Sequence, residues 1–329
     1  SLDYDSNQAV LDDSIAKASQ LGDSMVPLLL EKLQPAQGGS VSRNLAGNCR
    51  RVLQRMDPGS FVDAISEMAR GKHPIGRSEA IALLGYTNAP HSATVLSELL
   101  DQADEADRTL IIRSLRRLGA PGAAPKVVAL LGSQDRRLRE DVLRYLIAAR
   151  ANAVAATVVE ALSTETEDRV LPYYIDYFRS CVTEDLAATK ALLPLLQRDR
   201  IDWQDTKNLV RALATVAPRG HEATIRALAA LIESSEASSL AVQAAVTMRA
   251  LGQKQGIVKL KRQLDEKIRK RKRAAGLYEQ RASLLFAIGD FPQAHSDYQK
   301  ILDYSEGAAM TRRAYEGLIR CEARRKKIQ

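Results

Sequence analysis

Residues 124–149 have the sequence APKVVALLGSQDRRLREDVLRYLIAA, which predicts two helices joined by a short polar turn. Pro125 lies in the opening turn of the first helix, where its missing N–H does no harm. Asp135 ends the turn and is a typical cap for the helix that follows. The second helix places Leu138, Val142, Leu143, Leu146 and Ile147 on one stripe, at helical spacings of three and four.

This plan returns along most of the chain. Leucine or another small apolar residue closes a helical segment every 31 to 35 residues, often as a Leu-Gly pair: Leu21-Gly22, Leu84-Gly85, Leu118-Gly119 and Leu251-Gly252. A period of this length indicates stacked helix pairs, because one pair cannot bury its apolar face alone. We therefore expect an all-α fold, a right-handed α-solenoid of stacked antiparallel helix pairs, with almost no sheet.

The repeats resemble the HEAT-repeat family. The resemblance is carried by residues 127–139 and by residues 221–231 followed by 238–252, which are similar to its helix, polar turn and Ala/Leu-rich second helix. It covers about Asp12 to Gln263. The unit from Val170 to Val182 departs from the family pattern because it is rich in aromatic residues.

The C-terminal part changes character. Its residues Tyr278, Ala282, Gly289, Ala294 and Tyr298 fall close to the spacing of a tetratricopeptide (TPR) repeat, although a plain helical hairpin that seals the solenoid is the alternative. The expected organisation is a HEAT-like solenoid over 1–253, a basic connecting helix over 254–273 and a TPR-like unit over 274–329.

The connecting segment concentrates the positive charge. Residues 254–273 contain ten basic and two acidic residues, a net charge of +8 that equals the formal net charge of the whole chain. The candidate anion-binding residues are Lys267, Arg269, Lys270, Arg271, Lys272 and Arg273. Such a helix can attract nucleic acid, anionic lipid or an acidic protein, or it can be a solvated connector without a ligand.

The family resemblance also implies a partner surface. In HEAT repeats the second helix of each pair lines the concave face, and the corresponding candidates here are Arg113, Arg144, Tyr173, Tyr174, Tyr177, Trp203, Lys207 and Arg211. Arginine, tyrosine and tryptophan dominate binding hot spots. Each aromatic residue can instead pack between the helices. The leading interpretation is a non-enzymatic scaffold that binds a protein or peptide on this face.

Two other function classes stay open. A nucleic-acid-binding solenoid would use the inner arginines and the basic helix on phosphates. The resemblance also extends to enzymes, because some HEAT-like proteins are DNA glycosylases or phycobilin lyases. A glycosylase would need a carboxylate beside aromatic residues, such as Asp176 with Tyr173 and Trp203, or Asp202 and Asp205. We expect no enzymatic activity, no cofactor, no metal and no small-molecule substrate, because no catalytic or ligand-spacing motif is complete.

The location is expected to be cytoplasmic. The N-terminus Ser1-Leu2-Asp3-Tyr4-Asp5 is acidic and lacks the features of a signal peptide, and the cysteines Cys49, Cys181 and Cys321 are odd in number and far apart. The longest apolar run is far shorter than a transmembrane helix. Because the chain starts with Ser1, it is also compatible with a piece of a longer protein.

Overall fold

The computed structural model describes residues 8–33, 43–56, 61–71, 74–87, 89–197, 202–235, 238–305 and 307–325. These described residues form helices and contain no β-strand, which confirms the predicted all-α class. The chain divides into two compact units, Ser1–Tyr173 and Tyr174–Gln329. None of the described helices is both long and apolar enough to cross a membrane.

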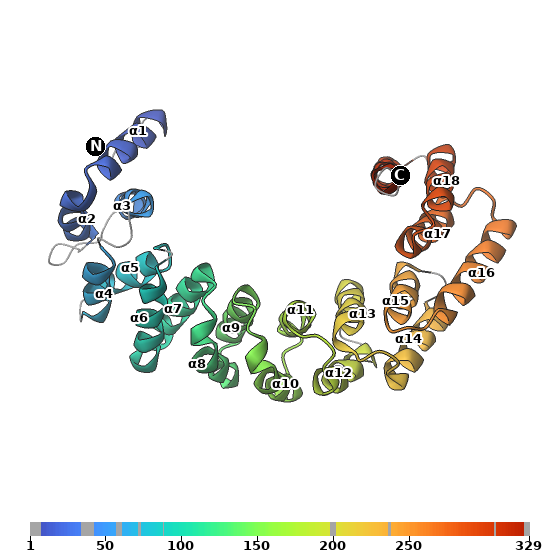
Figure 1. The fold of residues 1–329 in the computed structure, drawn as a ribbon, viewed down its shortest axis with the longest axis horizontal. Coiled ribbons are helices and arrows are strands. Elements are labelled where there is room, and N and C mark those ends of the chain that lie inside the picture. Colours follow the sequence, from blue (N-terminus) through green and yellow to red (C-terminus); the bar gives the residue numbers. More distant parts are fainter. Residues whose placement is uncertain are drawn as a thin grey trace. The chain divides into compact units, whose positions relative to one another are not determined.

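The first unit is a succession of helical hairpins, several of them joined through single 3-10 turns (Figure 1). Its helices are α1 (Gln8–Gln20), α2 (Val26–Leu33), α3 (Arg43–Arg55), α4 (Val62–Arg70), α5 (Pro74–Leu84), α6 (Pro90–Leu99), α7 (Glu105–Leu118), α8 (Ala124–Val128), α9 (Arg136–Ala148) and α10 (Ala155–Thr164). The second helices of successive pairs pack on each other, α5 on α7 and α7 on α9. This is the stacked-pair arrangement that the repeat period predicts.

The second unit continues the same plan. The boundary lies within the helix α11 (Leu171–Cys181), which is followed by α12 (Leu186–Leu192), α13 (Trp203–Val216), α14 (Glu222–Ser234), α15 (Ser239–Ala250), α16 (Gln255–Lys270), α17 (Ala275–Ile288), α18 (Phe291–Tyr304) and α19 (Ala308–Arg325). The helices α13, α15 and α17 pack in a row (Figure 1).

Local sequence signals set the helix ends. Asp104 caps α7 by accepting a hydrogen bond from the Asp107 amide at 2.8 Å, and Asp135 caps α9 in the same manner. Such a cap stabilises a helix by about 1 kcal/mol. At the other end of α7, Gly119 has φ 61°, a left-handed conformation that costs glycine nothing. The polar turns and the Leu-Gly pairs therefore lie where helices begin and end, as predicted.

In the hairpin of residues 124–149, the first helix does not continue as an α-helix up to the polar turn. The helix α8 ends at Val128, and the chain continues to Gly132 as the 3-10 helix η5 (Ala129–Gly132). Tightening of a last helical turn into 3-10 geometry is common, since it satisfies carbonyls that have no α-helical partner.

The segment predicted as a connecting helix is packed into the core. Residues Ile257, Leu260 and Leu264 of α16 are buried in the same hydrophobic cluster as Leu228 of α14 and Ala245 of α15. A second cluster then joins α16 to α17, α18 and α19 through residues such as Ile268. The helix α16 is therefore the packed first helix of a pair, and it belongs to the same compact unit as the helices around it.

Candidate functional site

A cavity of about 610 Å³ lies within the second unit. Its walls come from α13, α15, α17 and α19. The lining residues are Trp203, Lys207, Arg211, Ser239, Val242, Gln243, Val246, Glu279, Gln280, Ser283, Ala287, Arg313 and Arg320.

One side of α13 supplies three residues that the sequence predicts as partner contacts. Trp203, Lys207 and Arg211 are spaced by four residues, so they share one face of the helix. Leu209 and Leu213 are fully buried and anchor α13 in the core. The cavity wall is therefore carried by a helix whose position is fixed by packing.

These three side chains remain accessible to a ligand. The indole of Trp203 is 53% exposed, which is unusual for a tryptophan. The Lys207 Nζ lies 5.0 Å from the centre of the Trp203 ring, in a cation–π contact. Arg211 Nε donates a hydrogen bond to Gln243 Oε1 at 3.1 Å, a contact that leaves its charge unneutralised.

The cavity carries an excess of positive charge. Four cationic side chains and one carboxylate line it, and the carboxylate of Glu279 already pairs with Arg313 at 2.7 Å. Among the described residues, no carboxylate forms an ion pair with Lys207, Arg211 or Arg320. Partial burial lowers the pKa of Lys207, and the neighbouring Arg211 charge lowers it further, against the opposing effect of Glu279. An anionic group bound at this wall would therefore relieve the repulsion between the charges of Lys207 and Arg211.

Two polar atoms at the wall lack a hydrogen-bond partner within the described part of the chain. They are the buried Oγ of Ser239 and the buried Oε1 of Gln280. A buried polar atom without a partner costs about 1–3 kcal/mol. Both atoms are buried, so neither is open to a ligand in the cavity.

Close packing of α19 on α18 positions the last two cationic residues of the cavity, Arg313 and Arg320. An ideal Cβ on Gly317 would lie 2.5 Å from the ring of Tyr298 on α18, so only glycine permits this approach. Arg313 and Arg320 flank Gly317 on the same helix and reach the cavity wall. Gly317 therefore allows the close packing of α19 on α18 that brings Arg313 and Arg320 to the cavity.

The predicted partner residues of the first unit have a different role. Arg113 Nε of α7 pairs with the Asp141 carboxylate of α9 at 2.8 Å. Arg144 lies 3.6 Å from the same carboxylate and donates a hydrogen bond to the Tyr173 hydroxyl at 2.6 Å. Asp141 is only 3% exposed. These cations therefore hold neighbouring helices together.

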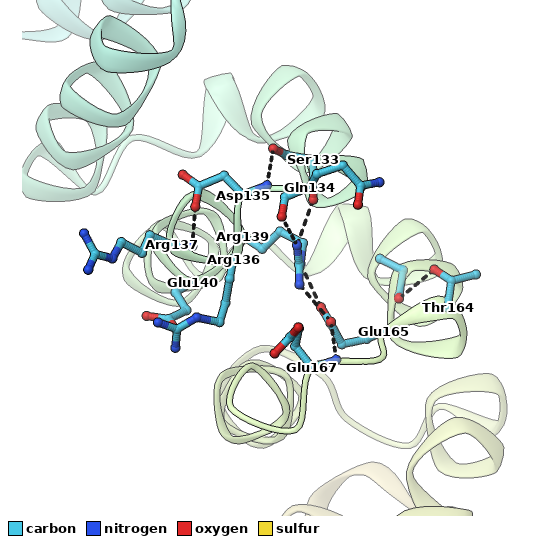
Figure 2. A network of polar contacts seen from close by, with 11 residues as sticks. Ser133, Gln134, Asp135, Arg136, Arg137, Arg139, Glu140, Thr164, Glu165 and Glu167 are labelled. Atoms are coloured by element: carbon cyan, nitrogen blue, oxygen red, sulfur yellow. Dashed lines mark hydrogen bonds and ion pairs between the residues drawn. The ribbon is translucent and has the colours of Figure 1, made fainter.

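A buried ion pair in the same unit also holds neighbouring elements together. Figure 2 shows Arg139 of α9 between the carbonyl oxygens of Ser133 and Gln134 and the carboxylate of Glu165. Both oxygens of Glu165 accept hydrogen bonds from Arg139, each at 2.9 Å. This bidentate contact connects the turn before α9 to the turn after α10.

Two of the predicted contact residues lie in the core. Tyr174 and Tyr177 are fully buried in the core, and Tyr177 packs edge-on against Phe178 with 5.3 Å between ring centres. Burial raises the pKa of the Tyr177 hydroxyl well above its ordinary value. Tyr173 is half-buried and stacks with Arg144.

The basic segment lies apart from the cavity, since none of its residues belongs to the lining. The helix α16 ends at Lys270, so Arg271, Lys272 and Arg273 lie in the turn that follows and not in a continuous helix. Arg269 and Lys270 are exposed at the end of α16, where cations are favourable because of the helix dipole.

Two of the carboxylates considered for a glycosylase have structural partners. Asp176 pairs with Arg179 at 2.9 Å, and Asp202 caps α13 by accepting from the Asp205 amide at 2.7 Å. Partial burial and the two nearby carboxylates raise the pKa of Asp205. Within the described ranges, no cluster of His, Cys, Asp or Glu could hold a metal ion.

Comparisons with known proteins agree with the architecture. Residues 61–147 match the family model for HEAT repeats. No curated protein sequence matches this chain.

Several solved structures are similar to the chain. One, from work on a phosphorylation switch that controls the interaction between cadherin and beta-catenin, has a TM-score of 0.48 and 15% identity, covering 98% of this chain and 81% of that chain. Another, the complex of CpcE and CpcF of phycocyanin lyase from Nostoc sp. PCC7120, has a TM-score of 0.37 and 18% identity, covering 68% of this chain and 94% of that chain. The HEAT-repeat match does not reach the C-terminal hairpins, so the TPR resemblance there stays an expectation. The described part of the chain is built of stacked helix pairs, and its residues 61–147 match HEAT repeats.

Proposed function

We propose that this protein is a non-enzymatic interaction scaffold that binds a protein segment in the cavity formed by α13, α15, α17 and α19. The observation that carries the proposal is the convergence of Trp203, Lys207 and Arg211 on this cavity, where each is accessible from solvent. Tryptophan and arginine at a recessed surface are typical hot-spot residues. Repeat solenoids present extended surfaces of this kind to partners.

A partner capture from the native source tests the proposal. The bait is the full chain, in the wild-type form and as the double variant Trp203→Ala/Arg211→Gln. The matched control is Lys190→Gln/Lys254→Gln, which changes two exposed residues of the same unit outside the cavity. We expect the wild type and the control to retain a protein that the cavity variant loses, and the purified partner to reproduce this difference.

Two outcomes would contradict the proposal. Equal retention by the cavity variant and the wild type, with both folded by circular dichroism, would place the partner surface elsewhere. If nuclease treatment removes the captured material, the basic end of α16 and a nucleic-acid function would become the better account.

A further inference from the structure

A second cavity lies beside the first one in the same unit. Its volume is about 690 Å³, and it shares Val246 of α15 and Ala287 of α17 with the first cavity. The two cavities are therefore neighbours along these helices, and we call them together the α15–α17 groove.

The second cavity repeats the charge character of the first. Arg219, Arg249 and Arg324 line it, and its lining contains no carboxylate. All three arginines are exposed, and Arg249 donates a hydrogen bond to the Ala287 carbonyl at 3.3 Å. Along the whole groove seven cationic side chains face one carboxylate, whereas the chain as a whole has 48 basic and 40 acidic residues. The ratio of basic to acidic residues is therefore far higher at the groove than in the chain as a whole.

Apolar surface separates the two groups of cations. Val246 and Ala287 lie where the cavities join, and the rings of Phe286 and Phe291 contact each other edge-on at 5.3 Å in the second cavity. Side chains of an extended peptide alternate between two faces, so such a peptide can place acidic and apolar groups in turn against these patches. A nucleic acid would instead present a charge on every phosphate, including those over the apolar patch. The groove thus offers cations for the carboxylates of a peptide and apolar surface for one of its side chains.

We infer that the partner segment is an extended acidic peptide with at least one apolar side chain, bound along the whole α15–α17 groove. This inference rests on the proposed function and specifies its ligand. The carboxylates of the peptide pair with the cations of both cavities, and its apolar side chain packs near Phe286 and Phe291.

The test uses fluorescence anisotropy with the full chain and two labelled peptides of equal length. One is a repeat of Glu and Ala with a single Phe, and in the other each Glu is replaced by Gln. We expect the Glu peptide to bind at least about tenfold more tightly, and its affinity to fall as salt increases. The variant Arg249→Gln/Arg324→Gln is expected to weaken Glu-peptide binding about tenfold, while the Lys190→Gln/Lys254→Gln control leaves it unchanged.

Each alternative outcome overturns the inference in a recognisable way. Equal binding of both peptides, lost in Trp203→Ala, would reject the acidic ligand and leave the proposed function standing. Failure of both peptides would reject the acidic ligand too, and the partner capture would then judge the function separately. An unchanged affinity in the Arg249→Gln/Arg324→Gln variant would limit the ligand to the first cavity. Tighter binding of a single-stranded oligonucleotide than of the Glu peptide would favour nucleic acid.

Discussion

The predicted contact arginines of the first unit, Arg113 and Arg144, pair with a carboxylate, whereas most cations that line the α15–α17 groove form no ion pair within the described part of the chain. Arg113 of α7 meets the carboxylate of Asp141 on α9, but Arg211 of α13 meets the neutral amide of Gln243 on α15. The same residue type therefore has two roles, and the neighbouring helix decides which one it has. A carboxylate opposite the arginine makes a connection between repeats, and an amide leaves the charge available for a ligand.

The largest expected effect concerns the buried pair of the first unit. The substitution Arg139→Met leaves the Glu165 carboxylate, only 3% exposed, without its bidentate partner. We expect a loss of about 3–5 kcal/mol in the free energy of unfolding, measured by urea denaturation. Arg113→Met should cost only about 1 kcal/mol, because Arg113 is half-exposed and the equally buried Asp141 keeps Arg144 at 3.6 Å and Arg116 at 3.9 Å. Equal costs would show that these two arginines do not compensate for the loss of Arg113.

The next comparison sets Tyr177 against Trp203. Tyr177→Ala should destabilise the chain by about 3–5 kcal/mol, because the ring is fully buried and its removal leaves a cavity. Trp203→Ala should change stability by less than about 0.5 kcal/mol, since the indole is exposed at the rim, but it should abolish partner binding. Thermal unfolding and the partner capture measure the two effects. A Tyr177→Ala protein that stays stable but no longer binds the partner would show that Tyr177 is a contact residue.

The fold could be predicted from sequence because its signals are local. Caps such as Asp135 and stop signals such as Gly119 act within one helical turn, and the apolar stripes repeat with the period of the structure. The core position of Tyr174 could have been predicted from the same periodicity. Together with Leu171, Ile175 and Phe178 it forms an i, i+3, i+4, i+7 stripe, which predicts a core position.

The site was predicted only in part, because it combines helices that are distant in the sequence. Its α13 residues were found, but Gln243, Glu279, Arg313 and Arg320 were missed. Assigning residues 254–273 to a connector removed α17 from the series of second helices. With α16 as the first helix of a pair, the spacing of Glu279, Ser283 and Ala287 by four would have placed one face of α17 beside α13 and α15. No local signal shows that α19 closes the cavity.

A smaller effect compares one backbone position in each unit. Arg150 and Glu184 both have φ 49°, a left-handed conformation that disfavours residues with a Cβ. Replacing either one by glycine should raise the free energy of unfolding by about 0.5–1 kcal/mol, because the strain relieved exceeds the entropy that glycine loses. Arg150→Ala is the control and should give no such gain. If alanine stabilises as much as glycine, the effect comes from the side chain and not from the backbone.

The most direct test of the contrast between paired and unpaired cations is the affinity of the labelled Glu peptide for Arg211→Gln and for Arg113→Gln, measured side by side by anisotropy. Each variant loses one positive charge, so a general electrostatic attraction would weaken both equally. We expect Arg211→Gln to weaken binding about tenfold, as for the loss of a charged contact in a recessed site, and Arg113→Gln to bind as the wild type does. Equal losses in the two variants, or a loss confined to Arg113→Gln, would contradict the account.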